Sequence, residues 1–434
     1  MATTVRRFLI NRTFARLWAG QAVSTVGDYI FDTTLVLWVA TVLAGGQPWA
    51  PAAVSGIMLS VGAAVLVVGP AAGVFVDRWN RRTTMLHSEV IRAILAGALT
   101  VLSFLSPHAL PIWLWLVAIY LVVFVLNSAG QFFGPARFAI IADVVEGTED
   151  RARAAGVSQA TVAAAGIIGP PLAAPLLFTV GIQWALLFNT LSYVASYLLI
   201  RSIRPTVGDV PAQTAPSAGL RAEFVAGLRF FAGNRFLVAI LVTAVIAAFG
   251  SGALNALDVF FVTQNLHTPS KFYGFISTAQ GIGAIIGGLG AAWVISRFTA
   301  RRTVWLAILV GGVLIVAYSR ATSFPVALVA IFLVVIPIAM VNTGLTPLLL
   351  ASTPPEFLGR VIAVFGPVTQ AASMLSVVIG GWLASTVLRG FHGTIGGVRF
   401  GAIDTIFLCT GLLIVAAGVY ASFALPPEPA PPVV

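Results

Sequence analysis

Long apolar stretches that recur along the whole chain restrict its fold more than any other feature. Each has about 20 residues, the length of a helix that crosses the roughly 30 Å hydrocarbon layer of a bilayer. Only 9% of the residues are charged, against about 25% in soluble proteins. The stretches lie near 17–43, 52–76, 83–105, 111–134, 154–179, 182–200, 236–263, 271–296, 302–319, 324–350, 360–388 and 402–424. The sequence therefore predicts an all-α membrane protein with twelve transmembrane helices.

The positive charges are distributed unevenly between the two sides of these spans. Nearly all arginines fall in the segment before the first span and in every second loop, whereas Lys271, Arg320, Arg389 and Arg399 fall on the other side. Loops rich in arginine and lysine face the cytoplasm. Both termini are therefore predicted to be cytoplasmic, in the inner membrane of a bacterium. Because this orientation accounts for the net charge of +10, no nucleic-acid partner is expected.

An internal repeat divides the chain. The stretch "VSQATVAAAGIIGPPLA" at 157–173 aligns without a gap with "VTQAASMLSVVIGGWLA" at 368–384. Such self-similarity is the signature of a duplicated unit, here of six helices inserted in the same orientation. The predicted parts are an N-terminal six-helix half at 1–200, a cytoplasmic linker at 201–235, a C-terminal six-helix half at 236–424 and a Pro-rich tail at 425–434.

Two sequence motifs resemble those of a known family. The stretch "GVFVDRWNRR" at 73–82 is similar to the loop 2–3 signature of the major facilitator superfamily, G-x-x-x-D-R-x-x-R-R. The first span, "FARLWAGQAVSTVGDYIFDTTLVLW", and "GPARFAIIADVV" at 134–145 resemble the drug-efflux branch that includes macrolide and enterobactin exporters. The resemblance implies a transporter with the major facilitator fold, in which two six-helix halves alternate the side on which a central cavity opens.

The resemblance also implies a gate on the cytoplasmic side. Gly73 would allow close approach of helices, and Asp77 would meet the N-terminal end of a helix in the other half, together with Arg78, Arg81 and Arg82. Small residues let backbones touch, and a helix N-terminus attracts a carboxylate by about 0.3–1 kcal/mol. The alternative is that these charges only anchor the loop in the cytoplasm.

The first span carries a polar stripe. Gln21, Thr25, Asp28 and Asp32 are spaced by four, three and four residues, which places them on one face of a helix. A charged Asp in the middle of a membrane costs at least about 2.5–3.5 kcal/mol, so such a residue normally faces a cavity or a partner. A buried carboxyl group also holds a proton more readily than an exposed one. Asp28 and Asp32 are therefore predicted to couple transport to protons, unless they form structural hydrogen bonds or stay in contact with water.

The seventh span repeats this pattern with Ser251, Asn255 and Asp258. Asp258 is closer to the outer end and is the weaker candidate for proton coupling. The residues predicted to line the cavity are Gln21, Thr25, Asn127, Gln131, Gln159, Asn255, Asn342 and Gln370, with Thr346 as a further candidate. Each of them is equally compatible with a hydrogen bond between helices.

Three further features bear on coupling. Glu89 and Arg92 lie three residues apart in the third span and are predicted to pair with each other. "GIIGPP" at 166–171 loosely resembles the Gly-Pro signature of antiporters, but has two residues rather than three between its first two glycines. The fourth span, "YLVVFVLNSAGQFF", lacks the arginine that many drug antiporters carry there. If that arginine relays protons in relatives, either Arg92 or another route serves here, or the coupling is different.

Nothing in the sequence indicates an enzyme. The only lysine, Lys271, does not follow a glycine-rich loop, so no phosphate-binding loop for ATP is present. Cys409 is alone within a span, and the histidines are scattered without the spacing of metal ligands. These histidines are His87, His108, His267 and His392. No cofactor and no metal are expected.

The sequence therefore predicts a monomeric secondary transporter whose partners are a small-molecule substrate, protons and the lipid bilayer. Its expected function is proton-driven export of amphipathic drugs or of a secreted metabolite. Two alternatives remain open. One is an importer of nutrients or metabolites on the same fold, and the other is a membrane receptor or assembly factor that no longer transports.

Overall fold

The computed structural model describes residues 10–76, 78–203, 229, 231, 233–353, 357–391, 393–395 and 398–425. Asp77 of the loop signature, most of the predicted linker and nearly all of the Pro-rich tail lie outside these residues.

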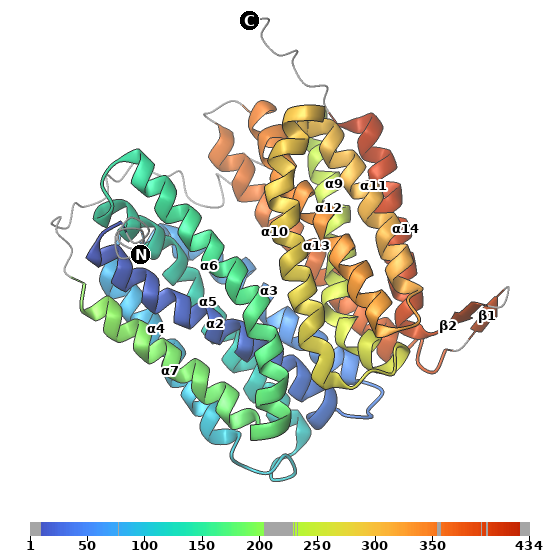
Figure 1. The fold of residues 1–434 in the computed structure, drawn as a ribbon, viewed down its shortest axis with the longest axis horizontal. Helices are drawn as coiled ribbons and strands as arrows, with labels where there is room; N and C mark the ends of the chain where they lie inside the picture. The colour runs from blue at the N-terminus through green and yellow to red at the C-terminus, as the bar shows by residue number, and fades with distance from the viewer. Residues whose placement is uncertain are drawn as a thin grey trace, which may run out of the picture. The chain divides into compact units, whose positions relative to one another are not determined.

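The described residues form long helices almost throughout (Figure 1). The helices are α2 (Arg12–Trp38), α3 (Ala50–Val76), α4 (Arg81–Leu102), α5 (Ile112–Val144), α6 (Thr148–Pro175), α7 (Ile182–Arg201), α9 (Arg235–Phe260), α10 (Tyr273–Phe298), α11 (Ala300–Ser319), α12 (Phe324–Ala351), α13 (Leu358–Ser385) and α14 (Ala402–Ala424). Short π-helical turns continue α2 at Val39–Leu43, α6 at Leu176–Val180 and α9 at Phe261–Asn265. The fold class predicted from the sequence is confirmed.

One described element is a β-hairpin rather than a helix. Between α13 and α14, β1 (Gly393–Ile395) pairs with β2 (Val398–Phe400) as an antiparallel hairpin. The two strands pair in register, Gly393 with Phe400, Thr394 with Arg399 and Ile395 with Val398, so that their backbone groups are satisfied by each other.

The length and composition of the helices identify a multi-pass membrane protein. Among the described residues, eleven helices are long and apolar enough to cross a membrane. The remaining long helix, α7, has 20 residues, which is enough for roughly 30 Å of hydrocarbon. It is less apolar because it carries polar residues such as Asn189 and Ser192, and both are buried within the protein.

The chain divides into two compact units. The first comprises Met1–Gly45, Ser60–Ala215 and Lys271–Thr278, and the second comprises Gly46–Leu59, Pro216–Ser270 and Ala279–Val434. In the first unit α2 packs on α6 and α7, and α4 packs on α5 and α7. In the second unit α9 packs on α13 and α14, and α11 packs on α12 and α14.

Glycines bring the helices of each unit into close contact. A Cβ atom added to Gly27 of α2 would lie 2.5 Å from the Ser192 Oγ and 2.6 Å from the Asn189 Oδ1 of α7. In the second unit, a Cβ on Gly312 of α11 would lie 2.6 Å from the backbone nitrogen of Val415 in α14. Lipid tails give helices no hydrophobic reason to associate, so close packing of small residues is what holds such helices together.

We expect a methyl group at Gly27 to destabilise the first unit. Gly27→Ala should lower the apparent Tm of the detergent-solubilised protein, because overpacking costs about 1–3 kcal/mol. Gly156→Ala in α6 is the matched control, since no described atom lies within 4 Å of the added Cβ. Its Tm should stay the same or rise slightly, because alanine favours a helix over glycine by about 1 kcal/mol. Equal Tm values for the two variants would contradict the proposed role of Gly27 in packing.

Candidate functional site

An ion pair between two helices forms the centre of the first unit. The Arg92 Nη2 of α4 lies 2.8 Å from the Asp28 Oδ2 of α2. The Tyr193 hydroxyl of α7 donates a hydrogen bond to the other carboxylate oxygen of Asp28. The Arg92 guanidinium also lies over the Tyr193 ring, 4.3 Å from its centroid. Three helices are thus joined through a single carboxylate.

Arg92 has a second, more distant carboxylate beside it. The Glu89 side chain is fully buried, and its Oε2 lies 3.9 Å from the Arg92 Nη1. Its other oxygen accepts a hydrogen bond of 2.8 Å from the Ser196 Oγ. The spacing in the sequence pointed to Glu89 as the partner of Arg92, but the short contact is with Asp28. A contact between helices leaves no mark in the spacing along one helix, and α2 and α4 meet here because both pack on α7.

A cavity of about 170 Å³ lies beside this ion pair. The residues that line it are Gln21, Ser24, Thr25, Asp28, Arg92, Gly130, Phe133, Gly134 and Arg137. The Asp28 side chain is 32% exposed, whereas that of Arg92 is only 10% exposed. The Asp28 carboxylate is therefore more accessible from the cavity than the Arg92 guanidinium.

Arg137 follows the end of the predicted fourth span, and the structure places it within a helix rather than in a loop. The apolar run of the fourth span weakens after residue 134, but α5 continues to Val144. Arg137 lies inside the helix and borders the cavity. Its Nη1 donates a hydrogen bond of 3.3 Å to the Gln21 Oε1.

A second carboxyl group is buried in the other unit. Asp258 of α9 is 1% exposed. It accepts hydrogen bonds from the Tyr318 hydroxyl of α11 and, at 3.0 Å, from the Gln280 Nε2 of α10. The Tyr318 ring lies among Phe261 and Phe407, with centroid distances of 4.8 and 5.8 Å. Asp258 lines neither of the two cavities described for this protein.

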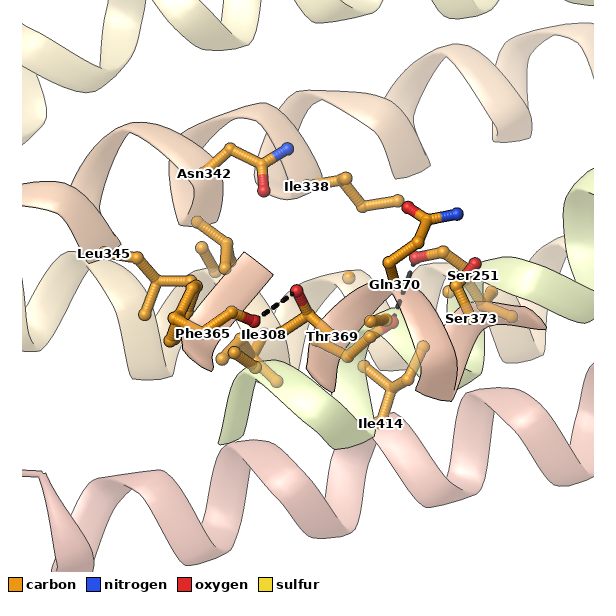
Figure 2. Close-up of a pocket in the computed structure, with 17 residues that line it drawn as sticks. Ser251, Ile308, Ile338, Asn342, Leu345, Phe365, Thr369, Gln370, Ser373 and Ile414 are labelled. Atoms are coloured by element: carbon orange, nitrogen blue, oxygen red, sulfur yellow. Dashed lines mark hydrogen bonds between the residues drawn. The ribbon is translucent and has the colours of Figure 1, made fainter. Parts of the chain in front are cut away.

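The second unit has a larger cavity, of about 420 Å³, that is partly open. Figure 2 shows it between α9, α11, α12, α13 and α14. None of its 17 lining residues is ionisable. The Ser251 Oγ donates to the Ala247 carbonyl at 3.0 Å, and the Thr369 Oγ1 donates to the Phe365 carbonyl at 2.9 Å. The amides of Asn342 and Gln370 are the remaining polar groups of appreciable size around this apolar space.

Asp32, predicted to couple protons, and Gln159 and Asn255, predicted to line the cavity, border neither of these two cavities. Their side chains are exposed, and their roles stay predictions. Asp32 makes no hydrogen bond or ion pair with any residue that the structure describes. Asn127 donates to the Val123 carbonyl of its own helix at 2.9 Å.

Two more predicted positions have different surroundings. Gln131 faces Gly69 of α3, where its Oε1 would lie 3.3 Å from an added Cβ. The side chain of Thr346 lies outside the described residues. Within the described parts of the chain, no group of three or more His, Cys, Asp or Glu side chains could hold a metal ion.

The arginines of the predicted gate bind within the first unit. The Arg81 Nη1 contacts both carboxylate oxygens of Asp143 in α5, at 2.8 and 2.7 Å. The Arg82 Nη2 donates to the Arg201 carbonyl at the end of α7, at 2.6 Å. Arg78 is exposed. These contacts fix the start of α4 to its neighbours.

For Asp77 and Gly73, the other two residues of the predicted gate, the structure describes no gating contact. Asp77 lies outside the described residues. No described atom lies within 4 Å of a Cβ added to Gly73. The gating role of this loop stays a prediction.

Comparisons with known proteins agree with this architecture. Residues 6–425 match the major facilitator family model described as "Transmembrane secretion effector". Macrolide efflux protein A of Streptococcus pyogenes is 22% identical over 414 residues, with 94% of each chain covered. The multidrug efflux pump Tap of Mycolicibacterium fortuitum is 25% identical over 378 residues, which cover 83% of this chain and 84% of the pump.

Solved structures show the same fold. A bacterial homologue of the iron transporter ferroportin, in its inward-facing state, superposes with a TM-score of 0.72 at 16% identity, covering 95% of this chain and 99% of the other. The nucleoside transporter NupG superposes with a TM-score of 0.70 at 13% identity, covering 95% and 98%. The family and these relatives are transporters rather than enzymes. The chain therefore belongs to the transmembrane secretion effector family of the major facilitator superfamily.

Proposed function

We propose that this transporter exports amphipathic small molecules, either drugs or a secreted metabolite, and is driven by protons. It works by alternating access in the cytoplasmic membrane of a bacterium, with both termini in the cytoplasm. Two of its relatives carry efflux in their names. The observation that carries the proposal is the Asp28–Arg92 ion pair at the edge of a cavity within a membrane-spanning unit.

Asp28 is the residue that we propose to bind the proton. Protonation of its carboxylate removes the charge that holds Arg92. An isolated guanidinium within a membrane is costly. However, the Glu89 carboxylate also lies near the Arg92 guanidinium, with 3.9 Å between Oε2 and Nη1. Two carboxylates thus share one arginine. Asp28 can gain and lose a proton while Arg92 keeps a counter-ion.

The other two predicted coupling residues fit this role less well. Asp32 forms no hydrogen bond or ion pair with a described residue that its protonation would break, although the charges of Asp28 and Arg92 act on it. Asp258 is buried, and both of its oxygens accept hydrogen bonds. We propose that Asp258 stabilises the second unit and that Asp32 is a secondary proton acceptor.

The proton gradient supplies enough free energy for export. One proton moving down one pH unit contributes about 1.4 kcal/mol, and one charge crossing 100 mV contributes about 2.3 kcal/mol. Together these support a concentration ratio of several hundredfold for each proton that is coupled to one substrate molecule.

The size and lining of the cavity in the second unit favour an amphipathic substrate. Its volume of about 420 Å³ falls within the roughly 300–1,000 Å³ of typical ligand pockets. It has no ionisable lining residue and offers the amides of Asn342 and Gln370. Such a cavity accommodates an uncharged, largely apolar part of a molecule.

The proposal predicts a transport defect in Asp28→Asn. We expect an efflux-deficient bacterium that expresses the wild-type protein to accumulate less of at least one dye in a fluorescent lipophilic panel than cells with an empty vector. A protonophore should abolish this difference. Asp28→Asn should accumulate dye like the empty vector, because an amide cannot carry the proton. Glu149→Gln is the control that should behave like wild type, since the Glu149 side chain is 90% exposed.

Other outcomes would change the proposal. Higher accumulation with the wild-type protein than with the vector would indicate import. If Asp28→Asn keeps export that responds to the protonophore, and Asp32→Asn loses it, Asp32 is the coupling residue. Export that ignores the protonophore altogether would contradict proton coupling.

The ion pair also predicts that the effects of substituting Asp28 and Arg92 on the apparent Tm are not additive. Arg92→Gln should lower the apparent Tm, because it leaves Asp28 and Glu89 without a counter-ion. Loss of one partner from a buried pair costs about 3–5 kcal/mol, and the partial exposure of Asp28 places this pair towards the lower value. Adding Asp28→Asn to Arg92→Gln should recover part of the loss. Additive Tm changes in the double variant would show that the two side chains do not depend on each other.

A further inference from the structure

Helices of corresponding order in the two halves line the two cavities. Along the first helix of each half, the lining residues have the same spacing, as they do along α5 and α12. The matching residues are Gln21, Ser24, Thr25 and Asp28 in α2 with Ala244, Ala247, Ala248 and Ser251 in α9, and Gly130, Phe133, Gly134 and Arg137 in α5 with Ile338, Val341, Asn342 and Leu345 in α12. One face of α2 and one face of α5 thus line the first cavity, and one face of α9 and one face of α12 line the second.

The chemistry of the two cavities differs at these matching positions. The faces of α2 and α5 that line the first cavity carry Asp28 and Arg137, whereas the faces of α9 and α12 that line the second carry no charged residue. The second half forms its cavity from uncharged residues. Packing of the helices therefore does not require a charged side chain there, and the partial burial of the Arg137 side chain needs another explanation.

The first cavity has hydrogen-bond donors that lack acceptors. Gln21 is 6% exposed, and its Nε2 has no partner among the described residues. Because its Oε1 already accepts from Arg137, this nitrogen is the free end of the amide. The Nε of Arg92, which also lines the cavity, is buried without a partner as well. A buried donor without an acceptor is unfavourable, and an acceptor supplied by a ligand removes the cost.

One of the two arginines that line the cavity has no described carboxylate beside it. Of the lining residues, Asp28 is negative, and Arg92 and Arg137 are positive. Asp28 is matched by Arg92 at 2.8 Å. Glu89 is fully buried and contacts Arg92 and Ser196. Arg137 has no carboxylate within 4 Å among the described residues, and its single described hydrogen bond is to Gln21.

We propose that the first cavity is a subsite for an anionic group of the transported molecule, a carboxylate in the first place. Arg137 supplies the positive charge, and the Gln21 Nε2 supplies a second donor. Guanidinium and carboxylate form strong, charge-assisted hydrogen bonds. A cavity of about 170 Å³ admits a carboxylate with a small ring, but not a whole drug. This inference rests on the proposed transport function and defines the class of molecule that is carried.

The test compares benzoate with benzamide, which has the same shape but no charge. The full-length protein in detergent is titrated with each compound at constant ionic strength, and Tm is followed by the fluorescence of its 10 tryptophans. Benzoate should raise the Tm of the wild-type protein saturably, and benzamide should not. Arg137→Gln should raise the half-saturating benzoate concentration at least about tenfold, as expected for loss of a charged hydrogen bond.

Two further variants separate binding from folding. Arg137→Lys keeps the positive charge and should retain part of the response to benzoate. Arg153→Gln removes an arginine whose partners are Glu149 and Asp150 at the start of α6, and should leave the response unchanged. Equal effects of benzoate and benzamide on the wild type, no saturable effect of benzoate, or an unchanged response in a folded Arg137→Gln would each overturn the subsite.

The result is independent of the transport assay. Binding of benzoate needs no proton gradient, so the subsite stands if benzoate binds but Asp28→Asn still exports dye. Conversely, proton-driven export that depends on Asp28, without benzoate binding, would leave the proposed function intact and remove only the anionic subsite.

Discussion

The cost of placing an ion within a membrane is the constraint on which this structure depends. A lone charge in hydrocarbon requires a partner or a cavity, and the first unit supplies both. Asp28, Arg92 and Tyr193 come from three helices and meet at a single point. The packing of α2 and α4 on α7 brings them together, and glycines such as Gly27 make that packing close enough. The ion pair and the small residues are thus parts of one arrangement.

The second unit meets the same constraint in another way. Its buried carboxyl group, Asp258, is surrounded by hydrogen-bond donors and aromatic rings rather than by a cation. Its cavity contains no ionisable group. The two halves have kept corresponding helices and corresponding cavities, but they differ in how they treat charge. The proposed division between a coupling half and an apolar half follows from this difference.

The fold could be predicted from the sequence, but the contacts between side chains of different helices could not. Apolar run length, the asymmetry of the arginines and the repeat together predicted an all-helical membrane protein with the major facilitator fold, because bilayer thickness and backbone hydrogen bonding leave few alternatives. The stripe in the first span identified Asp28 as a residue of interest. Its pairing with Arg92 could not be foreseen, since the two residues lie in different helices. Arg137 was missed because a membrane helix that lines a cavity carries polar residues beyond its apolar run.

The uncharged lining of the larger cavity has a consequence for substitutions within it. Exchanges among small and apolar residues at positions such as Ala248, Gly311 and Ile338 alter the shape of this space without changing the number of charges within the membrane. The ion pair of the other unit shares no residue with this lining. Single substitutions in this lining therefore reshape one unit while the ionic network of the other stays as it is.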